Sequence, residues 1–357
     1  MTLVRLTSGL LLSLLITTHC LAADQNAVVF MYHRFGESDF PATNIRLDQF
    51  DQHLALLEQG GYQVWPLEKI IDHLRNNQPL PDNTVAITVD DAYRSIYTEA
   101  YPRLKKRGWP FTVFVSTDVI DQKLPAYMSW DQMREMRQHQ VTFANHSASH
   151  DFLIRKQAGE SLQDWNRRIT GDIKRAQARI EKELGKAPML FAYPYGEYNE
   201  ALANIITQLG YTGFGQHSGA IGPHSDLRTL PRYPMAEAYA DIREFKTKAA
   251  SLALPVKTVK PWDPELDRDI QPEMEVSLAP SDARLDQLVC YVDGRKDVAV
   301  TWLDKDQRFI VRAKHPLPAG RSRYNCTAPS SQPGRYYWFS HLWIRQAEMN
   351  STPSERQ

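Results

Sequence analysis

The chain has 357 residues, with 42 basic and 42 acidic side chains and therefore no formal net charge at neutral pH. This balance excludes the basic footprint of a nucleic-acid-binding protein and the positive surface that anionic membranes attract. A chain of this length more often forms two domains than one.

The first 23 residues are typical of a secretory signal peptide. They contain one arginine, an apolar run from Leu10 to Ile16, and small residues at Ala22 and Ala23, after either of which we expect cleavage. The apolar run is shorter than the roughly 20 residues that a membrane span needs, and no later stretch is long or apolar enough. We therefore expect an exported chain, periplasmic or secreted, without a transmembrane segment.

Cleavage would remove Cys20 and leave two cysteines, Cys290 and Cys326. An even pair in an exported chain favours one disulfide. Two separate buried thiols are the alternative.

Between residues 24 and 255, short apolar runs alternate with amphipathic segments. Strands are expected at AVVFMY, VAITV, FTVFV, VTFAN and MLFA, and helices over residues 47–59, 131–138, 162–184 and 200–209. Glycines follow the first and last of these helices, as they commonly do at helix ends. This alternation predicts an α/β domain with a parallel sheet, either open or closed into a barrel.

The composition changes after residue 255. Residues 256–272 are rich in proline and charge and are expected to be a linker. Residues 273–346 show short alternating strands separated by polar turns, which predicts a small antiparallel β-sandwich, and residues 347–357 form a polar tail. The second domain also holds a concentration of aromatic residues that either bind glycan or, as strand alternation favours, pack in a core: Trp302, Tyr336, Tyr337, Trp338 and Trp343.

Three of the predicted strands end in clusters of polar residues. Asp90 and Asp91 end one strand, His146 and His150 follow the next, and residues 193–196 (YPYG) follow a third. Because the carboxyl ends of parallel strands open onto one face, we expect these clusters to converge.

His146 and His150 can bind one metal ion if the segment turns helically and directs both rings the same way. Two exposed loop histidines are the alternative for this pair taken alone. One carboxylate from Asp90 and Asp91 would complete a site with open positions, and the other could act as a general base on water. A turn or helix cap is the alternative for the two aspartates.

In this order and at these separations, residues 88–91 (TVDD), 146–150 (HSASH) and 193–196 (YPYG) resemble the first three motifs of the polysaccharide deacetylases. This is carbohydrate esterase family 4, the NodB-homology domain, whose fold is a distorted (β/α) barrel. The early stretch Met31-Tyr32-His33 resembles the exported subgroup that deacetylates biofilm polysaccharides.

The resemblance implies roles for five residues. Asp91, His146 and His150 would hold a divalent metal, for which zinc is the first candidate. Asp90 would be the general base, and the backbone N–H of Tyr195 would help to hold the oxyanion.

The last motif of the family supplies a histidine as general acid, and this chain has no clean copy of it. His217, after the short strand at residues 211–214, is the best candidate, with an inert loop histidine as the alternative. His33, Tyr193 and Pro194 are expected to line the substrate cleft, with a packing role as the alternative for His33.

The chain also departs from the family at Ala192, where an arginine usually orients the base. Arg232 is a basic residue that could reach the site instead. The histidines at positions 53, 73 and 139 lie among charged residues and are expected to be solvated.

Together these features predict a metal-dependent hydrolase that removes N-acetyl groups from an N-acetylglucosamine-containing polysaccharide and releases acetate. One alternative is an O-acetyl esterase that acts on an acetylated polymer such as xylan. The other is a catalytically silent glycan-binding protein, which the missing arginine and the missing last motif would fit.

Overall fold

The computed structural model describes residues 26–267, 269–305 and 307–346. The predicted signal peptide, Cys20 and the polar tail lie outside these residues. Within the described part of the chain, no helix combines the length and hydrophobicity that crossing a bilayer requires.

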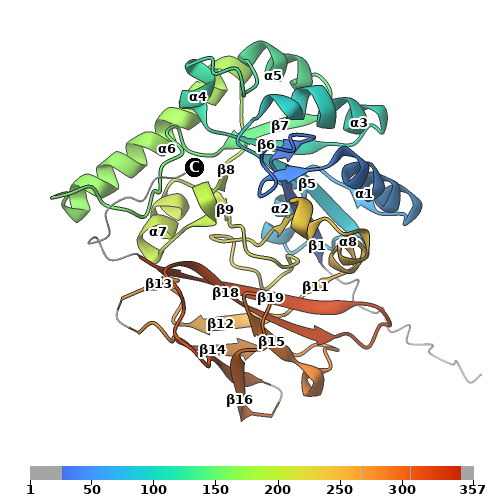
Figure 1. The fold of residues 1–357 in the computed structure, drawn as a ribbon, viewed down its shortest axis with the longest axis vertical. Coiled ribbons are helices and arrows are strands. Elements are labelled where there is room, and N and C mark those ends of the chain that lie inside the picture. Colours follow the sequence, from blue (N-terminus) through green and yellow to red (C-terminus); the bar gives the residue numbers. More distant parts are fainter. Residues whose placement is uncertain (1–25, 268, 306, 347–357) are drawn as a thin grey trace, which may run out of the picture.

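The first domain is built on a curled parallel sheet (Figure 1). Its main strand order is β10-β1-β5-β6-β7-β8-β9, and β4 pairs with the start of β5. The strands are β1 (Ala27–Tyr32), β4 (Gln63–Val64), β5 (Thr84–Asp90), β6 (Phe111–Val115), β7 (Val141–Asn145), β8 (Leu190–Ala192), β9 (Thr212–Phe214) and β10 (Tyr233–Pro234). A short parallel pair, β2 (Arg34–Phe35) and β3 (Asn44–Ile45), follows β1.

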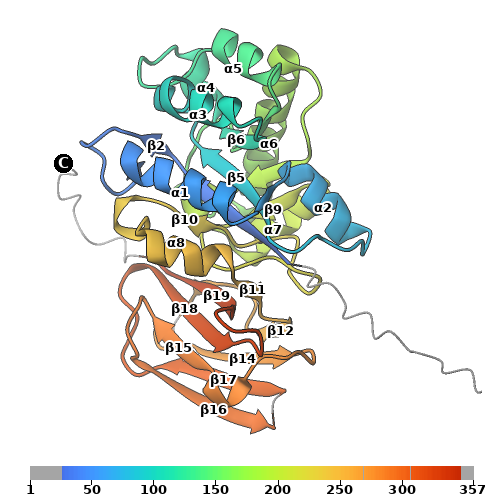
Figure 2. The same cartoon turned by 90° about the vertical axis from the view of Figure 1, so that its right-hand side faces the viewer.

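Helices pack around this sheet (Figures 1 and 2). They are α1 (Leu47–Gln59), α2 (Leu67–Arg75), α3 (Tyr101–Lys106), α4 (Thr117–Asp121), α5 (Trp130–Arg137), α6 (Leu162–Leu184), α7 (Glu200–Gln208) and α8 (Ile242–Ala249). Shorter helical turns are η1 (Ile96–Ala100), η2 (Pro194–Gly196) and η3 (Glu237–Tyr239). The predicted distorted barrel is confirmed as this curled half-barrel.

The second domain contains two mainly antiparallel sheets. One has the order β11-β19-β18-β15 with β13 beside β19, and the other has the order β12-β14-β17-β16. The strands are β11 (Leu252–Ala253), β12 (Val256–Lys260), β13 (Glu265–Leu266), β14 (Glu273–Leu278), β15 (Val289–Val292), β16 (Val298–Asp304), β17 (Arg308–Ala313), β18 (Gly320–Pro329) and β19 (Tyr336–Arg345), with η4 (Leu285–Gln287) before β15. The sheet that contains β18 and β19 lies nearest the first domain (Figure 2).

The stretch expected to be a linker is part of the second domain. Its residues 256–260 form β12, and Glu265 and Leu266 pair with the end of β19. Val256 and Val259 pack against the apolar core between the two sheets. The prediction of a linker relied on the proline and charged residues of this stretch and overlooked these two apolar positions. The other domain boundaries stay a prediction.

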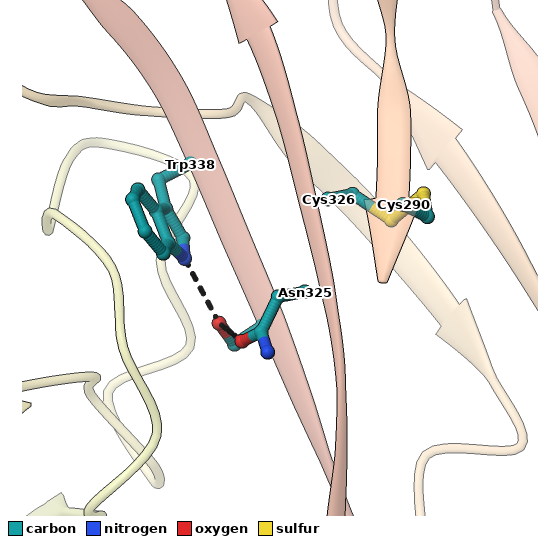
Figure 3. Close-up of a disulfide and its surroundings, with 5 residues drawn as sticks. Cys290, Asn325, Cys326 and Trp338 are labelled. Carbon is teal, nitrogen blue, oxygen red and sulfur yellow. Dashed lines mark hydrogen bonds between the residues drawn. A yellow bond between two sulfur atoms is a disulfide. The ribbon is translucent and has the colours of Figure 1, made fainter. Parts of the chain in front are cut away.

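Cys290 and Cys326 form the predicted disulfide. They are direct partners in the antiparallel pairing of β15 with β18, where their Cα atoms lie 4.0 Å apart. Figure 3 shows the bond on the side of β18 that faces the interior of the sandwich.

Removing this disulfide should destabilise the protein. The bond closes a 36-residue separation, and such cross-links typically contribute about 2–4 kcal/mol, largely by restricting the unfolded chain. We expect the double variant Cys290→Ser, Cys326→Ser to unfold at a lower urea concentration than the oxidised parent. An unchanged midpoint would show that the bond contributes little.

His53 is fully buried, so the expectation that it is solvated was wrong. Its ring stacks on Phe245 at 3.8 Å, its Nε2–H donates to the carbonyl of Ala240 at 2.9 Å, and its Nδ1 accepts from the Tyr32 hydroxyl at 3.1 Å. Burial lowers the pKa of His53 to about 4. The neutral ring is therefore part of the core.

This burial predicts a loss of stability in mild acid. The folded pKa lies below the unfolded value of about 6.5, so the unfolded state takes up the proton first and stability falls as the pH drops from 6.5 towards 4. Between pH 7.5 and 5.5, the parent should lose about 1 kcal/mol more unfolding free energy than His53→Gln. The exposed His139→Gln is the matched control, and equal losses in all three proteins would contradict the prediction.

Candidate metal centre and acid-base site

Asp90 points into the interior of the half-barrel. Along β5, Ile87 and Val89 pack beneath the surrounding helices, whereas Ala86 belongs to the apolar cluster inside the barrel. Alternation along the strand directs Asp90 to the same side as Ala86, where it is fully buried.

Arg232 neutralises this buried carboxylate. Its Nη1 and Nη2 atoms donate to Oδ1 and Oδ2 of Asp90 at 2.7 and 2.8 Å, and Nε donates to the carbonyl of Gly215 at 3.0 Å. Both side chains are fully buried. Burial favours the protonated form of Asp90, but Arg232 and His146 outweigh this effect and lower its pKa. Arg232 therefore holds Asp90 ionised, and it pairs with the residue that a family arginine, absent at Ala192 in this chain, was said to orient.

Asp91, His146 and His150, here called the metal cluster, lie together at the carboxyl edge of the sheet. Each offers one ligand atom, and these three atoms lie within 4.8 Å of one another. Nε2 of His146 and Nε2 of His150 are 3.3 and 3.1 Å from Oδ1 of Asp91. The predicted convergence of the first two polar clusters is therefore present in the fold.

The histidines are brought together by a turn rather than by a helix. Ser147 and His150 have positive φ values of 65° and 57°, and the Ser147 hydroxyl accepts from the backbone N–H of His150 at 2.9 Å. Asp91 also has a positive φ, of 72°. Non-glycine residues rarely adopt this conformation, and such residues concentrate at functional sites.

The chemistry of the cluster fits a divalent cation. Nδ1–H of His146 donates to the carbonyl of Ala192 at 2.7 Å, which fixes the ring and turns Nε2 towards Asp91. Oδ1 of Asp91 and Nε2 of His146 are both buried, without a hydrogen-bond partner among the described residues. Burial disfavours charge on Asp91, but the adjacent imidazoles outweigh it and hold its pKa well below the usual range. A cation bound by these atoms would satisfy both of them.

The sequence profile of one family, described as polysaccharide deacetylase, matches residues 77–214. This segment contains the metal cluster and Asp90. The match places residues 77–214 in the polysaccharide deacetylase family, and the first domain, which contains them, is here called the deacetylase domain.

Two curated relatives share part of this domain. The chain is 24% identical over 237 residues to a poly-beta-1,6-N-acetyl-D-glucosamine N-deacetylase of Escherichia coli K12, a match that covers 57% of this chain and 35% of that protein. A protein of the same name from Staphylococcus aureus MRSA252 is 23% identical over 208 residues, covering 57% of this chain and 71% of that protein. The chain thus spans about a third of the length of the first relative.

Solved structures show the same fold. IcaB from Ammonifex degensii superposes with a TM-score of 0.56 at 26% identity, covering 64% of this chain and 98% of that one. The Streptococcus pyogenes deacetylase PplD, determined with acetate, superposes with a TM-score of 0.55 at 25% identity and covers 61% and 96% of the two chains.

Within the deacetylase domain, His33 is the imidazole beside Asp90. Tyr32 pairs with Val89 in the parallel register of β1 and β5, so His33 follows at the level of Asp90. Its Nε2 lies 3.9 Å from Oδ2 of Asp90. Burial lowers the pKa of His33, although the nearby carboxylates oppose this effect.

His217 lies elsewhere. Among the described residues, its nearest aromatic neighbour is Tyr198, at 6.1 Å between ring centroids, and its backbone carbonyl accepts from the N–H of Arg232 at 3.0 Å. None of its recorded contacts reaches Asp90 or the metal cluster. The geometry therefore favours His33 over His217 as the imidazole that can exchange protons at the site.

Tyr193 and Pro194 shape the turn after β8. Both are buried, and the Tyr193 hydroxyl donates to the carbonyl of Arg228 at 2.8 Å. Because they are buried, packing accounts for these two residues better than the substrate contact expected from sequence.

Tyr195 is the half-buried residue of the same turn and has a positive φ of 59°. Its ring meets the edge of His150 at 4.7 Å and stacks on Phe152 at 4.0 Å. Its carbonyl accepts a hydrogen bond from Arg321 of β18. The second domain therefore contacts the active-site turn directly, which no sequence pattern indicated, because Arg321 lies 126 residues further along the chain.

Proposed function

We propose that this chain is an exported, metal-dependent deacetylase that hydrolyses the N-acetyl groups of a polysaccharide containing N-acetylglucosamine. The observation that carries this proposal is one buried site that combines the metal cluster with the ion pair of Asp90 and Arg232. The names of the curated relatives support an amino-sugar polymer as substrate.

The proposed roles follow the geometry. Asp91, His146 and His150 would hold the divalent ion, for which zinc remains the first candidate. Such an ion, when bound, polarises the acetamide carbonyl and lowers the pKa of a water molecule. All of these groups belong to the deacetylase domain, as does the backbone N–H of Tyr195, which is proposed to help hold the oxyanion.

Asp90 is the proposed general base. Held ionised by Arg232, it accepts a proton from the attacking water as the water oxygen bonds to the carbonyl carbon. The C–N bond then breaks, the amine nitrogen takes up a proton, and acetate and a free amine result. His33, beside Asp90, is placed to receive the proton that Asp90 took from water and to pass it to the leaving amine.

Export is proposed from two features. The disulfide between Cys290 and Cys326 fits an oxidising compartment. The first 23 residues have the composition of a signal peptide.

Acetate release from N-acetylglucosamine oligomers tests the function. The purified chain would be stripped of metal and then titrated with zinc, with acetylated xylan as a second substrate. Zinc-restored release from the oligomers is the expected result. Release from xylan alone would favour the O-acetyl esterase, and no release from either substrate with any divalent metal would favour a glycan-binding protein.

The two candidate acids can be separated by matched substitutions. His33→Gln should lower kcat by about 10²-fold or more, since a positioned acid typically contributes that much. His217→Gln should cause a much smaller loss, because its ring makes no recorded contact with the reacting groups. The reverse ranking of the two kcat values would restore His217 as the acid.

A further inference from the structure

A cavity of about 360 Å³ lies where the two domains meet. Loop residues 217–231 of the deacetylase domain form one wall, and β12 and the middle of β19 form the other. Neither Asp90, His33 nor the metal cluster lines this space, here called the seam cavity. Its volume falls within the roughly 300–1,000 Å³ of small-molecule sites.

One wall of the seam cavity is an open strand edge. β11 and β13 pair with the two ends of β19 and leave residues 339–343 between them without a partner strand on that side. The carbonyl of Trp338 and the N–H of Ile344 bond towards this edge. Ser340 lies two residues after Trp338 and four before Ile344, so its backbone N–H and C=O point to the same open edge of β19. Neither group has a hydrogen-bond partner among the described residues.

Two buried imidazoles line the cavity. His217 and His341 are only 6% and 5% exposed. Within the described chain, Nδ1 of His217 and Nε2 of His341 have no hydrogen-bond partner. Burial lowers the pKa of both rings to about 3. Each ring is therefore neutral near pH 7, with one donor and one acceptor nitrogen.

Aromatic side chains border these polar groups. Trp262 donates its indole N–H to Asp226 at 2.9 Å, and Trp338 donates to the Ser340 hydroxyl at 3.1 Å. Figure 3 shows Trp338 on the side of the sheet opposite the disulfide, beside a loop of the first domain. The guanidinium of Arg228 lies over one face of Trp262, 4.0 Å from the ring centroid. The remaining aromatic surface, next to neutral donors and acceptors, suits a sugar ring, which has apolar C–H faces and a rim of hydroxyls.

The charges at the cavity select among sugars. Arg228 is paired with Asp226, with Nη2 2.6 Å from Oδ2. Lys257 and Lys260 stand exposed on the rim. This excess of positive charge disfavours the ammonium group of glucosamine and leaves the neutral N-acetylated sugar as the better ligand.

We propose that the seam cavity is a second, non-catalytic binding site for one N-acetylated amino-sugar unit of the polymer. The ligand class rests on the proposed function. Such a site holds the chain on acetylated stretches and releases them once they become cationic.

Tryptophan indole signals in NMR spectra test this proposal. The Asp90→Asn protein, labelled with ¹⁵N-tryptophan, would be titrated with the N-acetylglucosamine trimer and then with the glucosamine trimer. The signals of Trp262 and Trp338 should shift saturably, with about tenfold weaker binding of the glucosamine trimer. Trp165, which is buried and donates its indole N–H to the carbonyl of Leu153, is the internal reference.

Two substitutions sharpen the result. His341→Leu should weaken binding of the acetylated trimer about tenfold. Because residue 341 is buried, its substitution can also disturb folding. The exposed pair Lys257→Glu, Lys260→Glu is therefore the second test, and it should reverse the preference towards the glucosamine trimer. Lys314→Glu, exposed and outside the cavity, is its matched control.

Static Trp262 and Trp338 signals, or shifts that none of these substitutions alters, would overturn the proposal. Acetate release by the parent chain is scored separately. Saturable shifts without any acetate release would therefore reject the proposed function but retain a sugar site in the seam cavity. Acetate release without shifts would support the proposed function and reject the sugar site.

Discussion

Asp90→Asn should lower kcat for acetate release by about 10²–10⁴-fold while bound metal stays at the parental level. The amide keeps the shape of the carboxylate but cannot take a proton from water. Asp90 lies outside the metal cluster, so the ligands are untouched. Activity assays and metal analysis of the same purified samples provide the measurement.

His150→Ala is the complementary variant and should lose both metal and activity, because it removes one of three ligand atoms. The exposed His139→Ala serves as its control and should retain both. Near-parental turnover in Asp90→Asn would show that another group is the base. Full metal retention in His150→Ala would show that the cluster is not the metal site.

Arg232→Met should destabilise the protein by about 3–5 kcal/mol, because it leaves the carboxylate of Asp90 buried without a counter-charge. Turnover should fall as well, since an unpaired buried carboxyl favours the protonated form, which cannot act as a base. Urea unfolding and kcat of the same variant are the measurements.

The double variant Arg232→Met, Asp90→Asn should recover much of that stability, since removing both charges removes the penalty. Arg167→Met is the surface control. Its partner Asp164 lies 3.1 Å away, but both side chains are more than half exposed, so little change is expected. Equal unfolding midpoints for Arg232→Met and Arg167→Met would contradict the assigned role of the buried pair.

The elements that were predicted well are specified by residues close to them in the sequence. Helix α6 spans the predicted residues because Ser161 caps its first turn and Gly185, with a φ of 73°, follows its last residue. The metal cluster was also accessible from sequence, since polar residues directly after apolar runs mark the carboxyl ends of parallel strands.

The features that were missed depend on distant partners. His53 appears solvated among its charged helical neighbours, yet Ala240 and Phe245, about 190 residues further along the chain, bury it. Arg232 was named from sequence as a basic residue that could reach the site, but only the curled sheet shows that it pairs with Asp90. The candidate acid was sought after the strand at residues 211–214, whereas the register of β1 with β5 brings His33 beside Asp90.

The position of β19 has a consequence for how the protein is made. This strand is the last element of the described chain, yet it lies between β18 on one side and β11 and β13 on the other. Its residues Leu342 and Ile344 also pack in an apolar cluster of the first domain. During synthesis, neither this sheet nor the apolar cluster of the first domain is complete until about residue 345 has emerged. A nascent or prematurely terminated chain therefore exposes an uncovered sheet edge and apolar surface, which makes it a substrate for chaperones and proteases.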